Sequence, residues 1–257
     1  MLDREWLQAF LPLGKVSEDG SWTPTGAGVL LHRPPVVWLV TAAHVVPPEP
    51  SRVAALVPTT TDGRELVDLR AIQERFKTSW VYDKASDLAA TLMPIGPAMK
   101  IKAIPAACCV DSSNVVPSMQ AYTVGCPYGF LYADVSAPLV QGGVIAGVDP
   151  GKAQILTTAP TFPGNSGGPL IVIRSNVSPA GGVTVGRQVV LLAGIVLQMA
   201  QIGTYPTNLL SGHTVGGPVL HLGVAVGMER VSSLLESEAA RAMTAAVHPT
   251  ATNKAGG

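Results

Sequence analysis

The stretch that decides the fold of this chain is Phe162-Pro163-Gly164-Asn165-Ser166-Gly167-Gly168-Pro169. Small and turn-forming residues surround a single serine. A nucleophilic serine needs a tight, open backbone, so that its hydroxyl projects and nearby N–H groups converge on an oxyanion. Glycines before and after the serine permit that backbone. The octapeptide therefore makes Ser166 a candidate nucleophile, with an ordinary serine in a glycine-rich turn as the alternative.

The residues that follow the octapeptide, 170–173, read Leu-Ile-Val-Ile and predict a strand. This matters because Gly164-x-Ser166-x-Gly168 also fits the Gly-x-Ser-x-Gly elbow of an α/β-hydrolase, in which a helix follows the serine and the histidine comes last. Three later histidines would be available to such an esterase or lipase: His213, His221 and His248. The strand signal opposes this alternative.

Two further stretches place polar groups beside apolar strands. Residues 40–46 (Val-Thr-Ala-Ala-His-Val-Val) end a β-branched strand with His44, whose small neighbours leave room for the imidazole to meet another side chain. Residues 85–90 (Ala-Ser-Asp-Leu-Ala-Ala) carry Asp87 into an apolar segment, where a carboxylate is costly unless it is paired. Taken alone, each residue reads as structural. Asp83 is the competing carboxylate, but its neighbours predict greater exposure.

The chain order His44, Asp87, Ser166 is one known solution of the serine–histidine–acid triad. On these segments the chain resembles the trypsin/chymotrypsin-fold serine proteases, because it matches their T-A-A-H, D-[IL]-A and G-[DN]-S-G-G-P motifs. Asn165 and a G-x-P-x-G-like loop at 125–129 resemble the high-temperature-requirement branch. The resemblance covers about residues 20–235, and no appended peptide-binding domain fits after them.

The resemblance implies a role for each matching residue. Ser166 Oγ would attack the scissile carbonyl, His44 would take up its proton and return it to the leaving amine, and Asp87 would fix the imidazole tautomer. The backbone N–H groups of Gly164 and Ser166 would form the oxyanion hole. The expected reaction is endopeptidase cleavage of a protein or peptide through a covalent acyl-enzyme, without a metal or another cofactor.

The resemblance also aligns three segments with the primary specificity pocket of the family. No acidic residue occurs in them, so an uncharged, small or apolar residue is expected before the cut. The backbone of residues 197–199 is expected to offer a strand edge to the substrate, and residues 200–220 to form either a lid or a flexible excursion. The expected pocket residues are Pro160, Thr161, Phe162, Leu197, Gln198, Met199, Gly223 and Ala225.

Many secreted members of the family carry an aspartate before the serine, and it pairs with a new N-terminus made by zymogen cleavage. Asn165 has no charge for that pairing, and no Ile-Val-Gly-Gly-like start is present. We therefore expect a protease that is not activated by N-terminal cleavage and that is controlled by loop ordering, a partner or the substrate. A catalytically silent descendant, which uses the fold as a binding scaffold, is the alternative of a different class.

The composition suits short strands joined by turns, with 47% hydrophobic residues, 13% charged residues, 27 glycines and 22 prolines in 257 residues. The strand signals predict two all-β halves, and the resemblance implies that each is a six-stranded antiparallel β-barrel of the chymotrypsin type. No helical period appears between a short N-terminal helix and Glu229. The strands expected in the second half are 121–125, 139–148, 153–158, 169–174, 188–199 and 222–226; residues 66–72 are expected as a strand of the first.

The expected organisation follows from these signals. It comprises an N-terminal helical extension (1–14), a first barrel with His44 and Asp87 (15–103), a linker (104–118), a second barrel with Ser166 (119–228), a C-terminal helix (229–247) and a flexible tail (248–257).

Charge and cysteine content limit the partners and the compartment. Lys+Arg and Asp+Glu both total 17, so no basic field favours nucleic acid. The longest apolar run, 189–197, is too short to span a membrane, and the start lacks the features of a secretory signal. Three cysteines without C-x-x-C spacing, Cys108, Cys109 and Cys126, predict reduced thiols. We expect a cytoplasmic protein whose extra apolar surface serves a regulatory protein partner or an oligomer.

Overall fold

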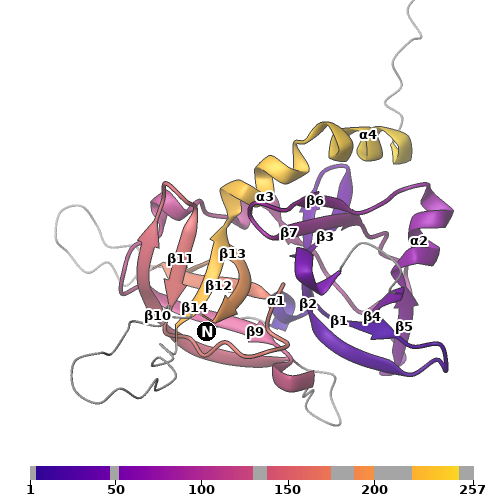
Figure 1. The fold of residues 1–257 in the computed structure, drawn as a ribbon, viewed down its shortest axis with the longest axis horizontal. Coiled ribbons are helices and arrows are strands. Elements are labelled where there is room, and N and C mark those ends of the chain that lie inside the picture. Colours follow the sequence, from indigo (N-terminus) through magenta and orange to yellow (C-terminus); the bar gives the residue numbers. More distant parts are fainter. Residues whose placement is uncertain (1–3, 47–51, 130–137, 175–187, 200–221, 249–257) are drawn as a thin grey trace, which may run out of the picture.

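The computed structural model describes residues 4–46, 52–129, 138–174, 188–199 and 222–248. Two β-structured halves lie side by side, and two C-terminal helices cross one end of the molecule (Figure 1). The mainly β architecture expected from the sequence is confirmed. The prediction that residues 200–220 form a lid falls outside the described residues, as does the tail beyond His248.

The first half is an open sheet, so the prediction of a first six-stranded barrel is wrong. Seven strands pair in the order β5-β4-β1-β2-β3-β7-β6, and a short eighth strand, β8, pairs in parallel with β2. The end strands β5 and β6 do not pair with each other within the described residues. The strands are β1 (Phe10–Val16), β2 (Trp22–Arg33), β3 (Val36–Ala42), β4 (Arg52–Pro58), β5 (Arg64–Asp68), β6 (Val81–Asp83), β7 (Leu88–Leu92) and β8 (Ile104–Pro105).

The physical reason for the open edge lies at the end of β5. The strand expected over 66–72 stops at Asp68, whose side chain accepts hydrogen bonds from the first amides of helix α2 (Leu69–Phe76). Lys77, in the left-handed region with φ 53°, ends the helix. Because α2 packs on β4, the chain turns back onto the sheet after Asp68 instead of continuing strand β5. A helix of eight residues gives only about two turns of period, which is why the sequence pattern did not reveal it.

The N-terminal segment also differs from the expectation. Helix α1 covers only Arg4–Leu7, and the remainder of the expected extension 1–14 is strand β1, which lies between β2 and β4. Leu11 and Leu13 on this strand are fully buried. The run Phe-Leu-Pro-Leu is apolar on both faces because β1 lies inside the sheet, and such a run is ambiguous between strand and helix.

The second half is a closed six-stranded antiparallel barrel in the order β10-β11-β14-β13-β12-β9, which confirms the prediction for this half. Its strands agree with the predicted ranges to within one residue at each end. They are β9 (Gln120–Gly125), β10 (Leu139–Asp149), β11 (Gln154–Thr157), β12 (Pro169–Arg174), β13 (Val189–Met199) and β14 (Gly223–Gly227). The strand β12 after Ser166, in place of a helix, excludes the α/β-hydrolase alternative.

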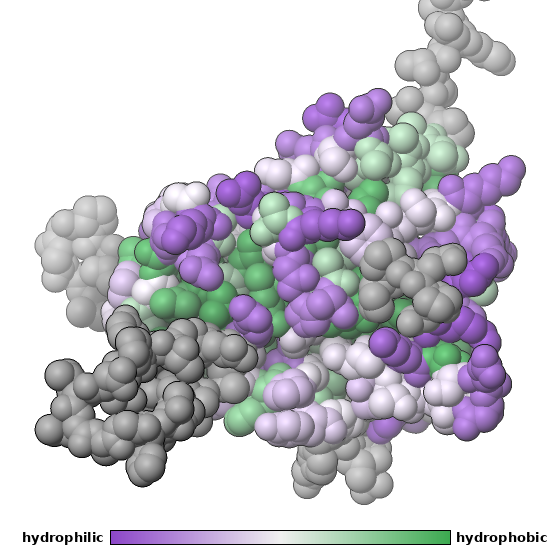
Figure 2. All heavy atoms as spheres, in the orientation of Figure 1, coloured by the Kyte–Doolittle hydropathy of each residue, from purple (hydrophilic) through white to green (hydrophobic). Residues whose placement is uncertain are grey.

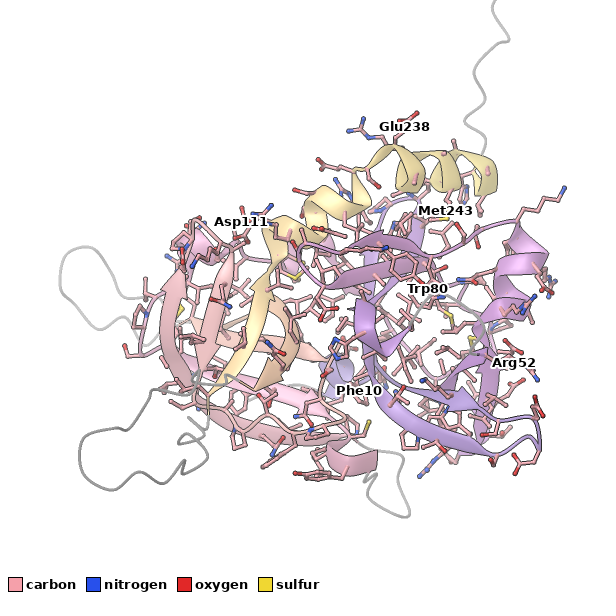
Figure 3. All side chains as sticks on the ribbon, in the orientation of Figure 1. Phe10, Arg52, Trp80, Asp111, Glu238 and Met243 are labelled. Atoms are coloured by element: carbon pink, nitrogen blue, oxygen red, sulfur yellow. The ribbon has the colours of Figure 1, made fainter. Side chains whose placement is uncertain are left out.

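The single C-terminal helix expected over 229–247 is two helices, α3 (Met228–Leu235) and α4 (Glu238–Val247). They separate where the Ser237 side chain accepts a hydrogen bond from Ala240 N and begins α4. The pair leaves the second barrel and packs on the first sheet, with Met243 pointing toward Trp80 (Figure 3). These helices therefore contact both halves of the molecule. Among the described residues, no helix has the length and apolarity needed to cross a bilayer.

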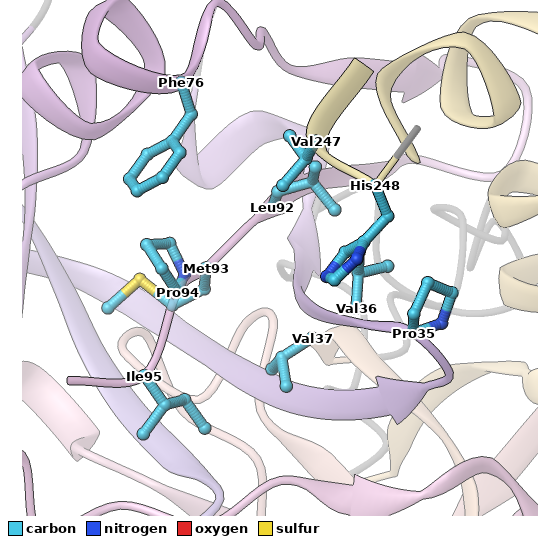
Figure 4. Close-up of a pocket in the computed structure, with 10 residues that line it drawn as sticks. All are labelled: Pro35, Val36, Val37, Phe76, Leu92, Met93, Pro94, Ile95, Val247 and His248. Carbon is cyan, nitrogen blue, oxygen red and sulfur yellow. The ribbon is translucent and has the colours of Figure 1, made fainter. Parts of the chain in front are cut away.

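Apolar side chains are also exposed at the surface of the described residues, for example beside α4 and on strand β10. Beside α4, a pocket of about 280 Å³ is lined mainly by apolar side chains, among them Val36, Phe76 and Val247 (Figure 4). Large apolar side chains are also exposed on strand β10, where Val140 and Val144 are about two-fifths exposed. One face of the molecule is shown in Figure 2, where apolar residues show over the second barrel and polar residues over the outer part of the first sheet.

Candidate active site

His44 and Asp87 meet because adjacent strands of the first sheet carry them. His44 lies in a 3₁₀ turn (Ala43–Val45) directly after β3, and Asp87 directly precedes β7. Ala42 at the end of β3 pairs with Leu88 at the start of β7, and this pairing places His44 and Asp87 close together beyond the strand ends. The distance from His44 Nδ1 to Asp87 Oδ2 is 2.6 Å, and His44 N–H donates to Asp87 Oδ1 at 3.1 Å.

The backbone at Asp87 is shaped for this contact. Its φ of 52° lies in the left-handed region, which aspartate tolerates better than most residues. Its carbonyl accepts from Ala43 N at 2.9 Å. These bonds occupy the Nδ1 side of the imidazole, so Nε2 is the ring nitrogen left for chemistry. The competing carboxylate, Asp83, accepts from the amides of Ala85 and Ser86 and shapes the turn that leads to Asp87.

Ser166 follows a tight turn that the sequence specifies residue by residue. Asn165 N–H donates to Phe162 O at 2.9 Å, with Pro163 and Gly164 at the two central positions. Gly164 has a φ of +100°, and proline followed by a positive-φ glycine is the signature of a type II turn. A Cβ on Gly164 would lie 2.1 Å from Cys126 O, so both the backbone angle and the space require glycine there.

The serine segment, although it belongs to the second barrel, is docked on the first sheet. Ala27 N–H donates to Ser166 O at 2.8 Å. A Cβ on Gly167 would lie 2.0 Å from Ala27 O and 2.2 Å from Thr41 Oγ1, and Thr41 is three residues before His44. A Cβ on Gly26 would meet both Val45 and Ser166 O within 3 Å. The serine and histidine segments are therefore packed against the same short part of β2.

The hydroxyl of Ser166 is engaged elsewhere in this structure. Ser166 Oγ donates to Leu197 O at 2.7 Å, and no hydrogen bond joins it to His44. The structure thus brings His44 and Asp87 into direct contact and brings the Ser166 segment alongside them, with the serine hydroxyl directed to strand β13.

The two backbone amides predicted to form an oxyanion hole are those of Gly164 and Ser166. Neither Gly164 N–H nor Ser166 N–H has an acceptor among the described residues, whereas the neighbouring carbonyls are all turned into the protein. Pro163 O accepts from Tyr128 N at 2.6 Å, and Gly164 O accepts from Cys126 N at 3.4 Å. Two unpaired donors on one side of a glycine-rich turn can stabilise an oxyanion.

The predicted pocket residues lie at one end of the second barrel. Thr161 is buried, Phe162 and Leu197 are half-buried, and Pro160 and Gln198 are exposed. A Cβ on Gly223 would lie 2.2 Å from Thr161 Oγ1, so little space is left between these two residues. Ala225 is fully buried in the barrel core, which makes it a core residue; the side chain of Met199 lies outside the described part.

Sequence reasoning missed the residues that support the serine turn. Thr123 Oγ1 donates to Pro160 O at 3.0 Å, and Asn165 Nδ2 donates to Gln141 Oε1 at 2.9 Å. Tyr128, 76% exposed, contacts Phe162 with the two rings tilted and their centroids 5.8 Å apart. The only sequence signal for Thr123 and Gln141 was that each is a polar residue within an otherwise apolar strand.

No group of three or more side chains that could hold a metal ion occurs among the described residues. All three cysteines are free thiols. Cys126 is buried directly beneath the serine turn, where its Sγ lies 3.4 Å from Gly164 O. Burial raises the pKa of this thiol to about 11, so it is a neutral packing group at physiological pH.

A closed antiparallel barrel beside a second antiparallel sheet, with a histidine–aspartate pair from one half and a glycine-flanked serine from the other, defines the trypsin-like class of fold. Residues 25–177 match the trypsin-like peptidase domain family. The match covers more than half of the chain, and the chain belongs to this family.

Solved structures agree with this assignment at the level of the fold. The chain is similar to two structures of the HtrA-type protease AlgW with a tripeptide, one of them a variant. The TM-scores are 0.55 and 0.53, with 16% and 17% sequence identity over 95% and 96% of this chain. This chain spans 62% of the length of those chains. Among curated proteins, none matches it in sequence.

Proposed function

We propose that this protein is a serine endopeptidase in which Ser166, His44 and Asp87 form the catalytic triad. The observation that carries the proposal is the 2.6 Å contact between His44 Nδ1 and Asp87 Oδ2, beside a serine turn with two free amides. In this arrangement Asp87 holds the imidazole so that Nε2 can accept the serine proton. The amides of Gly164 and Ser166 then stabilise the oxyanion of the tetrahedral intermediate.

One rotation completes the triad. Ser166 Oγ leaves Leu197 O and turns toward His44 Nε2 by a change of side-chain rotamer. Catalytic hydrogen bonds in a free enzyme are often formed only when substrate is bound. Attack on the scissile carbonyl forms an acyl-enzyme and releases the amine, to which His44 returns the proton. Water then hydrolyses the ester by the same route.

A peptide substrate fits along strand β13. The pairing of β13 with the β12 side ends at Val196, while Gln198 and Met199 still pair with β14 on the other side. Within the described residues, the backbone of 197–199 therefore has a strand edge without a partner next to Ser166, to which an extended peptide can add by backbone hydrogen bonds. AlgW was solved with a tripeptide, and we propose the same class of ligand here.

The preference before the cut follows from the lining of the pocket. Buried Thr161, close to Gly223, leaves little room, and the described lining holds no acidic residue that could pair with lysine or arginine. We propose that a small or medium apolar residue precedes the cut. Cleavage of a peptide library, read by mass spectrometry, tests this; preferential cleavage after Arg or Lys would contradict it.

Activation and location complete the proposal. Asn165 is buried, uncharged and bonded to Gln141, so it offers no carboxylate to a new N-terminus. We propose that activity does not require N-terminal trimming, and that a regulatory protein, an oligomer or the substrate itself controls it. Because all three cysteines are free thiols, we also propose a cytoplasmic location. Activity that appears only after N-terminal processing would refute the first of these points.

The primary test is labelling with a fluorophosphonate probe, which reacts with assembled serine nucleophiles. We expect the wild type to be labelled on Ser166, as located by peptide mass spectrometry, and Ser166→Ala to be unlabelled. Ser233→Ala is a matched control, because Ser233 lies on the exposed side of α3 and donates to Glu229 O. A wild type that stays unlabelled, with and without peptide ligands, would favour the silent binding scaffold instead.

A further inference from the structure

We propose that Thr123 and Gln141 are positioning residues, which clamp the two ends of segment 160–165 so that the oxyanion amides stay free. The inference rests on the proposed function and adds residues that no triad motif contains. Thr123 lies on β9 and Gln141 on β10, outside the serine segment itself.

The register of the barrel places both clamping side chains together. Gln141 pairs directly with Thr123 across the β9–β10 ladder, and directly opposed residues in an antiparallel pair project from the same face of the sheet. Thr123 Oγ1 donates to Pro160 O at 3.0 Å, at the start of the segment. Gln141 Oε1 accepts from Asn165 Nδ2 at 2.9 Å, at its end. One directly opposed residue pair of the barrel thus bonds to both ends of segment 160–165.

The orientation of the Asn165 side chain depends on its hydrogen bond to Gln141. Asn165 is fully buried, and its Oδ1 has no hydrogen-bond partner among the described residues. Within the described part of the chain, the contact with Gln141 is therefore the only hydrogen bond that fixes the orientation of this side chain. A Cβ on Gly125 would lie 2.7 Å from Asn165 Cγ, so the amide is packed directly against β9 as well.

The clamped residues control the oxyanion donors through the backbone. Asn165 lies between Gly164 and Ser166, whose N–H groups are the two free donors. Pro160 begins the same segment, and the intervening Pro163 O is held by Tyr128 N. When Asn165 or Pro160 is released, the turn is held by backbone hydrogen bonds such as that from Tyr128 N to Pro163 O, and the N–H groups of Gly164 and Ser166 can shift away from the positions that face an oxyanion. The clamp therefore acts on the transition state rather than on substrate binding.

The test compares three variants with the wild type in fluorophosphonate labelling, with the rate constant at saturating probe and the half-saturating probe concentration measured separately. Gln141→Leu and Thr123→Val remove one bond each, whereas Gln141→Glu keeps an acceptor oxygen for Asn165 Nδ2. We expect the saturating rate constant to fall about tenfold or more in the first two variants and to be largely restored in Gln141→Glu. In the charge-neutral variants Gln141→Leu and Thr123→Val, the half-saturating concentration, the final labelled fraction and the pH midpoint of labelling should stay as in the wild type, because His44 and Asp87 are untouched.

Gln120→Leu is the matched control. Gln120 lies on the same strand as Thr123 and donates to Tyr122 Oη at 2.6 Å, on the exposed side of the barrel. A lower labelled fraction with an unchanged rate constant would mark a purely structural role and overturn the proposal. Equal rates in Gln141→Leu, Thr123→Val and wild type would also overturn it. A wild type that is not labelled at all would instead contradict the proposed function, so failure of this inference can be distinguished from failure of the proposed function.

Discussion

Replacement of Gly164 by alanine tests the role of the serine turn most directly. Gly164 has a φ of +100°, and a Cβ there would lie 2.1 Å from the carbonyl oxygen of Cys126. Real Cβ contacts essentially never fall below 3.0 Å, so either the turn or the Cys126 peptide must move by about 1 Å. The backbone angle adds a strain of about 1–3 kcal/mol for a residue with a side chain.

The expected loss of activity follows from this displacement. Gly164 supplies one of the two free amides, and removal of one oxyanion donor costs about 10²–10³ in rate. A misplacement of about 1 Å near a reacting group costs about 10²-fold. We therefore expect Gly164→Ala to react with a fluorophosphonate about 100- to 1,000-fold more slowly than the wild type.

Gly20→Ala is the matched control, because Gly20 also has a positive φ, +83°, but a Cβ there would have nothing within 4 Å. It should lose stability in urea denaturation through the backbone angle alone and keep the wild-type labelling rate. A folded Gly164→Ala protein that is labelled within about threefold of the wild-type rate would refute the argument that the turn presents the oxyanion donors.

Three further predictions concern other parts of the molecule. Asp87→Asn should slow labelling about 10³–10⁴-fold at unchanged stability, because an amide in contact with His44 Nδ1 favours the tautomer that cannot accept the serine proton; a near-wild-type rate would argue against the triad. Asp68→Ala should lower the free energy of unfolding by about 0.5–2 kcal/mol, because the cap of α2 is lost. Burial acts to raise the pKa of Asp68, but hydrogen bonds from Arg52 and from two α2 amides hold it below its ordinary value of 3.8. This stabilisation is full above the ordinary pKa and is lost as the pH falls through the lowered one, so urea titrations of the two proteins should converge in acid; a difference that persists there would contradict the assignment. Cys126, whose pKa burial raises to about 11, should resist iodoacetamide in the folded protein at pH 8 and react in urea, as followed by mass spectrometry; rapid native alkylation would show that the base of the serine turn is open.

Much of the candidate site could be predicted from the sequence, because its residue types and the turn before Ser166 depend on residues adjacent in the chain. The turn before Ser166 needs Pro163 and Gly164 at its two central positions, and both stand adjacent in the chain. The strands of the second barrel could be predicted to within one residue, since short apolar runs alternate there with turn residues. The positions of His44 and Asp87 beside strand ends were also visible, although their contact was not.

The first half of the fold could not be predicted as well. Whether a set of strands closes into a barrel depends on which edges pair, and that choice is made by distant segments. At the end of β5, the cap at Asp68 directs the chain into α2, which covers β4 and leaves the sheet open. The apolar run at Phe10–Val16 gave no period that separates a central strand from a helix.

The sequence alone therefore determined the residue types of the site, their order and the turn that carries Ser166, because these depend on neighbours along the chain. Only the tertiary structure decided the pairing of His44 with Asp87, the resting bond from Ser166 to Leu197 and the support of the turn by Thr123 and Gln141. Each of these contacts joins residues far apart in the chain. Their distances are fixed by strand register and by the packing of one half against the other, which a local pattern of residues does not contain.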